Sequence, residues 1–525
     1  MYKALVGVVS AALLVSAATL PVAAKEFKWA FQTDTTHLDP HGHNVTFSAG
    51  FLGNIYEGLV RRNEKLEIEP ALATKWELVS PKVWRFHLRK GVKFHNGNDF
   101  TADDVVFTAA RTLHEDSLVK RRMATVDKVV KIDDHTVEFH TSVPNPILTA
   151  EWENWHMMDK EWAEKNGAAS PTNLNKGIES FAGRNANGTG PFKIVERTVD
   201  VKTVLVPNPD WWDKPVHNLT KVIMTPITQD ATRVAALLSG EIDMMYPVPV
   251  QDINRVNANN GTSVTVGPEL RTIFLLMDQL RDNLLGTDAK NPYKDIKVRQ
   301  AVYHAINIEA IKKKIMRGLS DPSSIMISPK LFPKGNSIKR LAYDPAKAKA
   351  LLAEAGYPNG FTTRFDCPND RYVNDEQICQ AIVSMWAKVG IKANLTAQPK
   401  AKYFAQIGRP NRDFHIGLLG WTPGSFDSHN VLSNLHVTWN EKTSQGRFNY
   451  GDFSNARVDE LTEMILVETD AAKRDAMILE AYTITTDNVF YVPLHQQALA
   501  WGKRDNIEMR QRADNQFRFF WVRVN

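Results

Sequence analysis

The chain has 525 residues, of which 43% are hydrophobic and 23% charged, and its formal net charge is +5. This length exceeds one ordinary hydrophobic core, so we expect a soluble globular protein of two or three domains. The basic residues are dispersed except for short clusters at 61–62, 120–122 and 312–314, and no zinc-finger or RNA-recognition motif accompanies them. These features disfavour nucleic acid as a partner.

Residues 1–24 have the pattern of an export signal. Lys3 precedes an apolar run over residues 4–20, and the sequence Val-Ala-Ala at 22–24 supplies the small side chains of a signal-peptidase site. The run is short and rich in Ala and Ser, which disfavours a membrane anchor. No Cys lies near the predicted cut, so we expect a free mature protein without stable membrane insertion.

Residues 56–107 predict a strand, a turn and a helix, in that order. Apolar and polar side chains alternate over residues 84–88, which is typical of a strand with one buried face. The sequence Asn-Gly-Asn at 96–98 tolerates left-handed backbone and predicts a reversal. Thr101, three residues before Asp104, resembles a capping box at the start of an amphipathic helix.

Predicted strands and helices continue to alternate along the rest of the chain, which favours an α/β fold. Strands are expected near 222–225 and 273–277, and helices over 230–238, over 298–317, from Pro345 to near Gly356, and from a cap at Asn374 and Gln377 to Gly390. No internal repeat, heptad pattern or low-complexity tract is apparent.

Cys367 and Cys379 are the two cysteines of the chain. In an exported protein a disulfide is the default expectation. Closing so short a loop would stabilise the fold by roughly 3 kcal/mol in the chain-entropy model. Two free thiols remain the alternative.

Several joined motifs carry a family resemblance. They are Tyr-Glu-Gly-Leu at 56–59, the pattern P-x-L-A-x-x-W at 70–76, the strand and turn F-x-L-R-x-G-V-K-F-H-N-G at 86–97, and T-A-D-D-V-V-F at 101–107. In this order they resemble the family 5 extracellular solute-binding proteins, the peptide, nickel and opine receptors of bacterial ABC importers. The resemblance implies an α/β fold with two lobes, the type II periplasmic-binding-protein fold in its large family 5 variant.

The resemblance also implies a domain layout. The first lobe is expected to contain residues 25–76, 185–271 and 491–525, with an added subdomain at 77–184, and the second lobe residues 272–490. The chain would then cross between the lobes near residues 272 and 491. Two crossings make a hinge about which lobes can close on a solute.

Solute-binding residues are expected from matching family positions. Arg371 lies where dipeptide receptors place an Arg that binds the solute carboxylate, a task that suits a planar guanidinium. An internal ion pair with Asp370 or Asp375 is the alternative. Trp421 is expected to stack on the solute while its N–H donates, with a core role as the alternative. Asp39 and Tyr56 are weaker candidates from family position.

The sequence departs from the peptide-receptor pattern at Gly424. Peptide receptors in the family bind the solute ammonium through the Asp of a G-W-(T/S)-G-D motif, and this chain has Gly424 at that position. Asp427 matches a second family Asp and is a further candidate. The departure makes a non-peptide solute, such as an opine or an oligosaccharide, a credible alternative.

His37, His41 and His43 form the pattern H-x-x-x-H-x-H, which could converge on nickel, zinc or haem iron. The Leu-Asp-Pro core of this segment recurs in metal-free peptide receptors of the family. We therefore expect a solvated loop, with no metal and no cofactor.

The expected function is capture of peptides, or of a related small polar solute, in the periplasm and delivery to an inner-membrane ABC permease by a monomeric protein. Receptors for opines, oligosaccharides, nickel or haem are the alternatives. The sequence lacks the serine-hydrolase elbow G-x-S-x-G, the zinc motif H-E-x-x-H, the P-loop motif and the dinucleotide fingerprint, so an enzyme, such as a secreted hydrolase, is the least favoured class.

Overall fold

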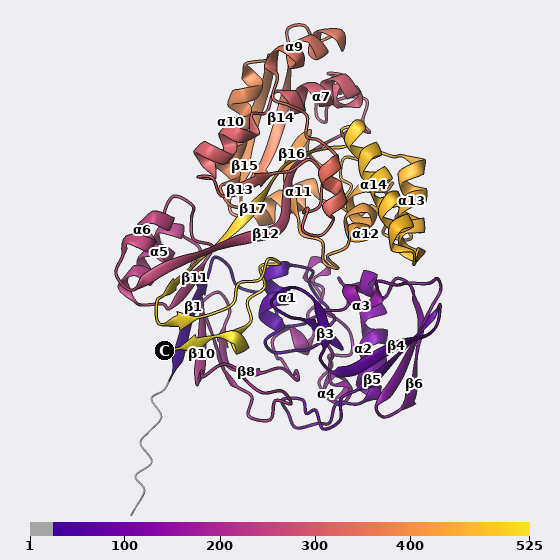
Figure 1. Ribbon diagram of the computed structural model, residues 1–525, viewed down its shortest axis with the longest axis vertical. Coiled ribbons are helices and arrows are strands. Elements are labelled where there is room, and N and C mark those ends of the chain that lie inside the picture. The colour runs from indigo at the N-terminus through magenta and orange to yellow at the C-terminus, as the bar shows by residue number, and fades with distance from the viewer. Residues whose placement is uncertain (1–24) are drawn as a thin grey trace, which may run out of the picture.

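The computed structural model describes residues 25–525, so the predicted export signal at 1–24 lies outside the described residues. The chain forms two lobes joined by the long strands β12 (Thr262–Met277) and β17 (Tyr491–Arg504), which run antiparallel from one lobe into the other (Figure 1). Residue 272 lies within β12, and β17 begins at residue 491. None of the helices described for residues 25–525 is both long and apolar enough to cross a lipid bilayer.

One mixed sheet extends through both lobes. Within the described residues it has eleven strands, and the short strand β13 (Ser320–Pro322) pairs with β17 beside the main order. In spatial order the others are β15 (Ile391–Gln398), β14 (Phe361–Pro368), β16 (Ile416–Trp421), β12, β17, β11 (Met244–Tyr246), β1 (Glu26–Phe31), β10 (Lys221–Pro226), β9 (Lys202–Pro207) and β8 (Phe192–Thr198).

The first lobe surrounds an aromatic core. Strand β1 pairs in parallel with β10 and β11, and its Trp29 stacks on Tyr246 with ring centroids 5.7 Å apart. Trp501 of β17 packs against the same tyrosine. Helices α1 (Thr46–Leu52), α5 (Asp230–Ser239) and α6 (Ile253–Ala258) belong to this lobe, and β18 (Ile507–Glu508) pairs with β19 (Arg523–Val524) near the C-terminus.

A separate antiparallel sheet covers one side of the first lobe (Figure 1). Its strands, in spatial order, are β4 (Ala73–Ser80), β5 (Val83–Leu88), β7 (Thr136–Thr141) and β6 (Val126–Asp133). Helices α2 (Ala102–Leu113), α3 (Leu148–Glu151) and α4 (Lys160–Lys165) accompany it, and β2 (Val60–Arg62) pairs with β3 (Ile68–Pro70). The strand predicted over 84–88 is confirmed as part of β5, and the capping box of Thr101 and Asp104 is confirmed at the start of α2.

Helices flank the sheet of the second lobe. They are α7 (Ile296–His304), α8 (Ile308–Ala310), α9 (Pro345–Glu354), α10 (Asp375–Ala387), α11 (Lys400–Ile407), α12 (Ser428–Val431), α13 (Ala456–Val467) and α14 (Ala471–Asp487). The single helix predicted over 298–317 is wrong, because the chain leaves the helix after His304 and Asn307 caps a new turn by accepting a hydrogen bond from the Ala310 backbone N–H.

The start of α10 also differs from the prediction. Asn374 has a left-handed backbone, with φ of 54°, and its side chain does not cap the helix. The carboxylate of Asp375 instead accepts hydrogen bonds from the backbone N–H groups of Arg371, Tyr372 and Glu376. A disulfide between Cys367 of β14 and Cys379 of α10 joins this helix to the sheet.

Buried histidines predict a loss of stability in acid. Burial lowers the pKa of His436 and of His495 from 6.5 to about 3. The pKa of each imidazole is lower in the folded chain than in the unfolded chain, so below pH 6.5 the unfolded chain binds more protons. The free energy of unfolding therefore falls as the pH is lowered from 6.5 to about 3.

The variant His436→Phe tests this dependence, because His436 packs against the rings of Tyr482 and Tyr491. Urea titrations at about pH 7.5 and about pH 4.5 should show the variant losing about 2.5 kcal/mol less than the wild type between the two conditions. An equal loss in both proteins would mean that this imidazole does not resist protonation.

Candidate functional site

The candidate site lies where the two lobes face each other beside the crossing strands. The ladder between β12 and β17 shifts register between Pro268 and Thr272, so residues 269–271 bulge out of the pairing. The side-chain N–H of Gln497 donates a hydrogen bond to the carboxylate of Glu269. The side-chain oxygen of Gln497 accepts a hydrogen bond from the Val373 backbone N–H at 3.4 Å. The bulge thus connects the hinge to the loop that precedes α10.

Arg371 is the cation that this loop presents. Its guanidinium carbon lies 5.0 Å from the centroid of the Tyr372 ring, and burial lowers its pKa, with repulsion from Arg271 as a further cause. Its side chain makes no hydrogen bond or ion pair with any residue from 25 to 525. An unpaired guanidinium in such surroundings is suited to receive an acid group from a solute.

The internal pairing that was the alternative for Arg371 does not form. Asp375 is engaged by backbone N–H groups, as described above. Asp370 accepts a hydrogen bond from the backbone N–H of Lys400 at 2.6 Å. Neither carboxylate contacts the guanidinium of Arg371.

Trp421 lies at the end of β16 and is half-buried. Its indole N–H donates to the side-chain oxygen of Asn430 at 3.1 Å, and its ring packs against Phe448 with centroids 4.8 Å apart. The N–H predicted for a solute is therefore already used by Asn430. The ring face remains the part of Trp421 that could contact a solute.

Gly424 follows on an exposed turn. A Cβ atom built at this position would have as its nearest neighbour the side-chain nitrogen of Asn430, at 3.9 Å, which is an ordinary contact. The backbone therefore does not require glycine here, and a larger side chain would fit. The missing carboxylate is a property of the sequence and not a steric consequence of the fold.

Asp427 is held by protein donors. It caps α12 by accepting a hydrogen bond from the His429 backbone N–H at 2.7 Å, and it accepts two more from the guanidinium of Arg474 at 2.8 and 2.7 Å. Burial alone would raise the pKa of Asp427, but Arg474 lowers it, so the carboxylate is ionised and paired. Protein donors occupy both oxygens, yet Asp427 lines the cavity between the lobes, so its role as a solute ligand stays a prediction.

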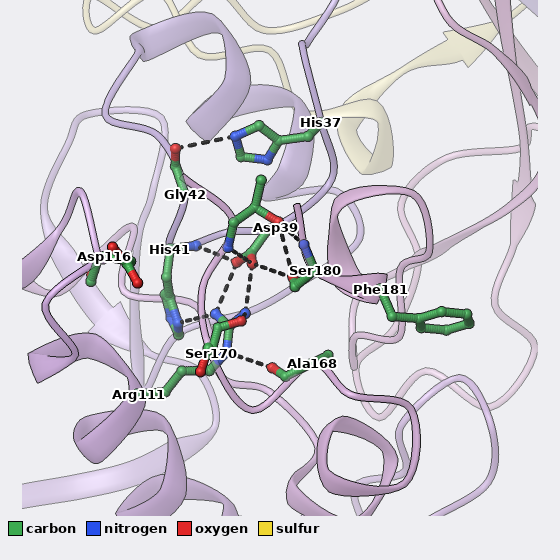
Figure 2. A network of polar contacts seen from close by, with 12 residues as sticks. His37, Asp39, His41, Gly42, Arg111, Asp116, Ala168, Ser170, Ser180 and Phe181 are labelled. Carbon is green, nitrogen blue, oxygen red and sulfur yellow. Dashed lines mark hydrogen bonds and ion pairs between the residues drawn. The ribbon is translucent and has the colours of Figure 1, made fainter. Parts of the chain in front are cut away.

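Asp39 is buried in a closed polar network (Figure 2). Arg111 donates to both carboxylate oxygens, at 2.9 and 2.6 Å, and the Thr172 backbone N–H donates at 2.8 Å. Burial opposes ionisation, yet the Arg111 guanidinium holds the pKa of this carboxyl well below its usual range. Asp39 ties its loop to α2 and to the segment around Thr172. This corrects its expected contact with solute.

Tyr56 is also fully buried, within the first lobe. Its ring stacks on that of His156, with centroids 6.2 Å apart, and belongs to the same hydrophobic core as Trp29. Tyr56 therefore stabilises the lobe and does not reach the space between the lobes, which corrects its expected role.

Two of the three histidines of the early loop, His37 and His41, form hydrogen bonds within the protein. His41 accepts a hydrogen bond from Arg111 at Nδ1 and donates one from Nε2 to the His156 carbonyl, at 2.8 and 3.1 Å. His37 is 3% exposed and pairs with the Gly42 carbonyl, so the predicted solvated loop is wrong. Across residues 25–525, no group of three or more His, Cys, Asp or Glu side chains is arranged to hold a metal ion.

Contacts between the lobes were not predicted. Arg121 of the first lobe donates to the Ser444 carbonyl at 2.7 Å and to the Ser433 hydroxyl at 3.2 Å in the second. Arg62 donates to the Ser425 carbonyl at 3.1 Å, and its guanidinium lies 4.4 Å from the Phe426 ring centroid. The lobes are therefore held together, and a cavity of about 530 Å³ remains between them. Arg62, Pro268, Ser425, Phe426 and Asp427 are among its lining residues, whereas Arg371 and Trp421 are not. No local pattern marks Arg62 and Arg121, since their partners are hundreds of positions away.

Removing the Arg121 contacts should weaken solute binding. In Arg121→Ala, two hydrogen bonds specific to contacting lobes are lost, so we expect the solute Kd to rise roughly tenfold with little change in the melting temperature of the solute-free protein. Lys120→Ala, at the exposed neighbouring position, is the matched control. Titration calorimetry of both variants measures the effect, and equal Kd values would show that Arg121 does not support closure.

Solved structures with this architecture are two-lobed periplasmic binding proteins. The chain superimposes on DppA of Helicobacter pylori, solved in complex with the peptide STSA, with a TM-score of 0.83 at 25% identity over 95% of this chain and 98% of that one. It also superimposes on AgaA of A. tumefaciens R10, solved with agropinic acid, with a TM-score of 0.80 over 95% and 99% of the two chains. At 22% identity, this second likeness supports the fold alone.

The relatives found by sequence are also named as binding proteins. Heme-binding protein A of Haemophilus influenzae is 27% identical over 466 residues, or 84% of this chain and 81% of the relative. Glutathione-binding protein GsiB of Pectobacterium atrosepticum is 28% identical over 473 residues, or 87% and 86%. The model of the bacterial extracellular solute-binding proteins, family 5, matches residues 67–442. The chain belongs to this family, which confirms the resemblance found in its motifs.

Proposed function

We propose that the protein is a periplasmic receptor that captures peptides, or a related small polar solute, and delivers it to an ABC permease in the inner membrane. The observation that carries the proposal is the half-buried guanidinium of Arg371, which has no hydrogen-bond or ion-pair partner among residues 25–525 and lies beside Arg271 of the crossing strand β12. The role needs directed polar groups and an aromatic face rather than bond-breaking residues, so the protein binds without catalysing a reaction.

Lobe closure is the proposed mechanism of capture. The first lobe comprises residues 25–76, 185–271 and 491–525 with the subdomain 77–184, and the second lobe residues 272–490. Rotation about β12 and β17 opens and closes the cleft, and the solute stabilises the closed state because it bridges both lobes. The receptor acts as a monomer and needs no cofactor.

The second candidate is a receptor for a conjugated amino acid such as an opine or glutathione. Gly424 favours it, since the position that would supply a carboxylate for a peptide ammonium has none. Relatives of this chain are named for glutathione and haem, and a solved neighbour at 25% identity, MoaA of A. tumefaciens R10, holds mannopinic acid.

The variant Gly424→Asp distinguishes the two candidates. The added carboxylate has room, so the variant should bind peptides with a free N-terminus about tenfold more tightly than the wild type does, through a charge-assisted hydrogen bond. The same peptides with an acetylated N-terminus are the control and should gain nothing. An equal gain for both peptide sets would show that Asp at this position does not meet the ammonium.

A thermal-shift screen tests the proposed function. The mature protein is melted with peptides, opines, glutathione, sugars, nickel salts and haem. A solute that binds the folded protein at about 100 times its Kd adds about 2.7 kcal/mol of stability. We expect peptides or acid-bearing conjugates to raise the melting temperature with concentration. A shift from another class, with none from peptides, would contradict the peptide assignment.

A further inference from the structure

Arg371 is not the sole guanidinium beside Tyr372. The guanidinium carbon of Arg271 lies 5.9 Å from the centroid of the same ring, against 5.0 Å for Arg371. Arg271 belongs to the bulge of β12, whereas Arg371 belongs to the loop before α10. The hinge and the second lobe therefore each place one guanidinium group beside the Tyr372 ring.

The side chain of Arg271 is only partly satisfied. Its residue is 4% exposed, and its Nε donates to Glu269 at 3.1 Å. Neither of its Nη groups donates to an acceptor among residues 25–525. A guanidinium carries five N–H donors, so four of the five donors of Arg271 have no acceptor among residues 25–525.

The carboxylates near the two guanidinium groups are engaged by other donors. Glu269 is the carboxylate paired with Arg271, and its second oxygen accepts from Gln497. Arg371 has no ion pair within the described part of the chain. The carboxylate of Asp375, which also acts on the charge of Arg371, is held by backbone N–H groups. The half-buried guanidinium of Arg371 and the Nη groups of the buried Arg271 therefore have no acceptor of their own among residues 25–525, and an added acid group could supply one.

We infer that Arg271 forms a second anion subsite next to Arg371, so that the solute is an acid with two anionic groups. An acidic peptide, or an amino acid bearing an added carboxyalkyl group, has the required chemistry. One acid group meets Arg371, and the other meets the free Nη groups of Arg271. The inference rests on the proposed function, because it names the solute class of the same cleft.

Matched solutes provide the test. Titration calorimetry compares Ala-Glu with Ala-Gln and Ala-Asp with Ala-Asn, and compares a carboxyalkyl amino acid with its monoamide. Each pair differs by one carboxylate at nearly constant size. We expect the diacid of a binding pair to bind at least about tenfold more tightly than its amide partner.

Two variants at the bulge should move this preference in opposite directions. Arg271→Gln should reduce the diacid preference to less than about threefold. Glu269→Gln should increase the preference, since it removes the competing carboxylate and keeps a side chain that can bond to Gln497. Arg271→Lys retains the charge and should retain most of the preference, and melting temperatures establish that every variant is folded.

The outcomes separate the two proposals. If the carboxyalkyl pair alone binds, with the diacid favoured and Arg271 required, the peptide assignment fails and the second anion subsite stands. If peptides bind with equal affinity for acid and amide, the subsite fails and the peptide assignment stands. A diacid preference that survives Arg271→Gln, or cleft binding of neutral solutes alone, would overturn the inference.

Discussion

Replacing Glu153 by alanine should lower the free energy of unfolding by about 3–5 kcal/mol, the cost of breaking a buried ionic network by removing one partner. Glu153 is 3% exposed and contacts three guanidinium groups, those of Arg62, Arg512 and Arg518. Burial would raise its pKa, but the three arginines lower it, so the side chain is a carboxylate. In the variant, the three cations would share Asp514 alone.

The ionic network around Glu153 links several segments of the chain, so the loss of stability in Glu153→Ala is not limited to one ion pair. It joins β2, the segment after α3 and the C-terminal segment, so it connects three distant parts of the first lobe. Urea or thermal unfolding of the mature protein measures the loss. Glu64→Ala is the control, because Glu64 forms an exposed ion pair with Arg510 and should cost less than about 1 kcal/mol. Equal stability of the two variants would show that the buried network contributes little.

Replacing Arg371 by alanine should raise the solute Kd by about 100-fold or more. Loss of one member of a buried charge pair costs about 2–5 kcal/mol in binding, and the acid group of the solute would lose its main partner. The melting temperature of the solute-free protein should change little, since the guanidinium bonds to no residue from 25 to 525. Titration calorimetry with the solute found by the thermal-shift screen measures the loss.

A conservative variant refines this prediction. Arg371→Lys keeps the charge but cannot form two parallel hydrogen bonds with a carboxylate, so we expect an intermediate loss of about tenfold. Lys392→Ala, at an exposed position of β15, is the control for a general effect of charge in the second lobe. Unchanged affinity in Arg371→Ala would remove this residue from the site.

Local patterns predicted the local structure well. The strand within β5 and the capping box of α2 depend on residues close in sequence, and both were found as expected. The long helix over 298–317 failed because Asn307 can cap a new turn, a competition that the apolar stripe does not reveal. Motifs identified the family, because several of them occur together in a fixed order.

Site residues were harder to predict, because burial and pairing depend on distant segments. Asp39 has a charge and a family position suited to binding, yet its partner Arg111 lies far along the chain on helix α2. Arg271 carried no signal in the sequence, since its role depends on a bulge that forms when β12 pairs with β17. Arg371 was proposed because the residues just before a predicted helix matched a family position, and its role stays a prediction.

Small-angle X-ray scattering of the mature protein, with and without the solute that raises its melting temperature most, tests directly whether solute is captured by lobe closure. We predict that saturating solute reduces the radius of gyration, because the lobes rotate together about β12 and β17. An identical radius with and without saturating solute would contradict capture by closure.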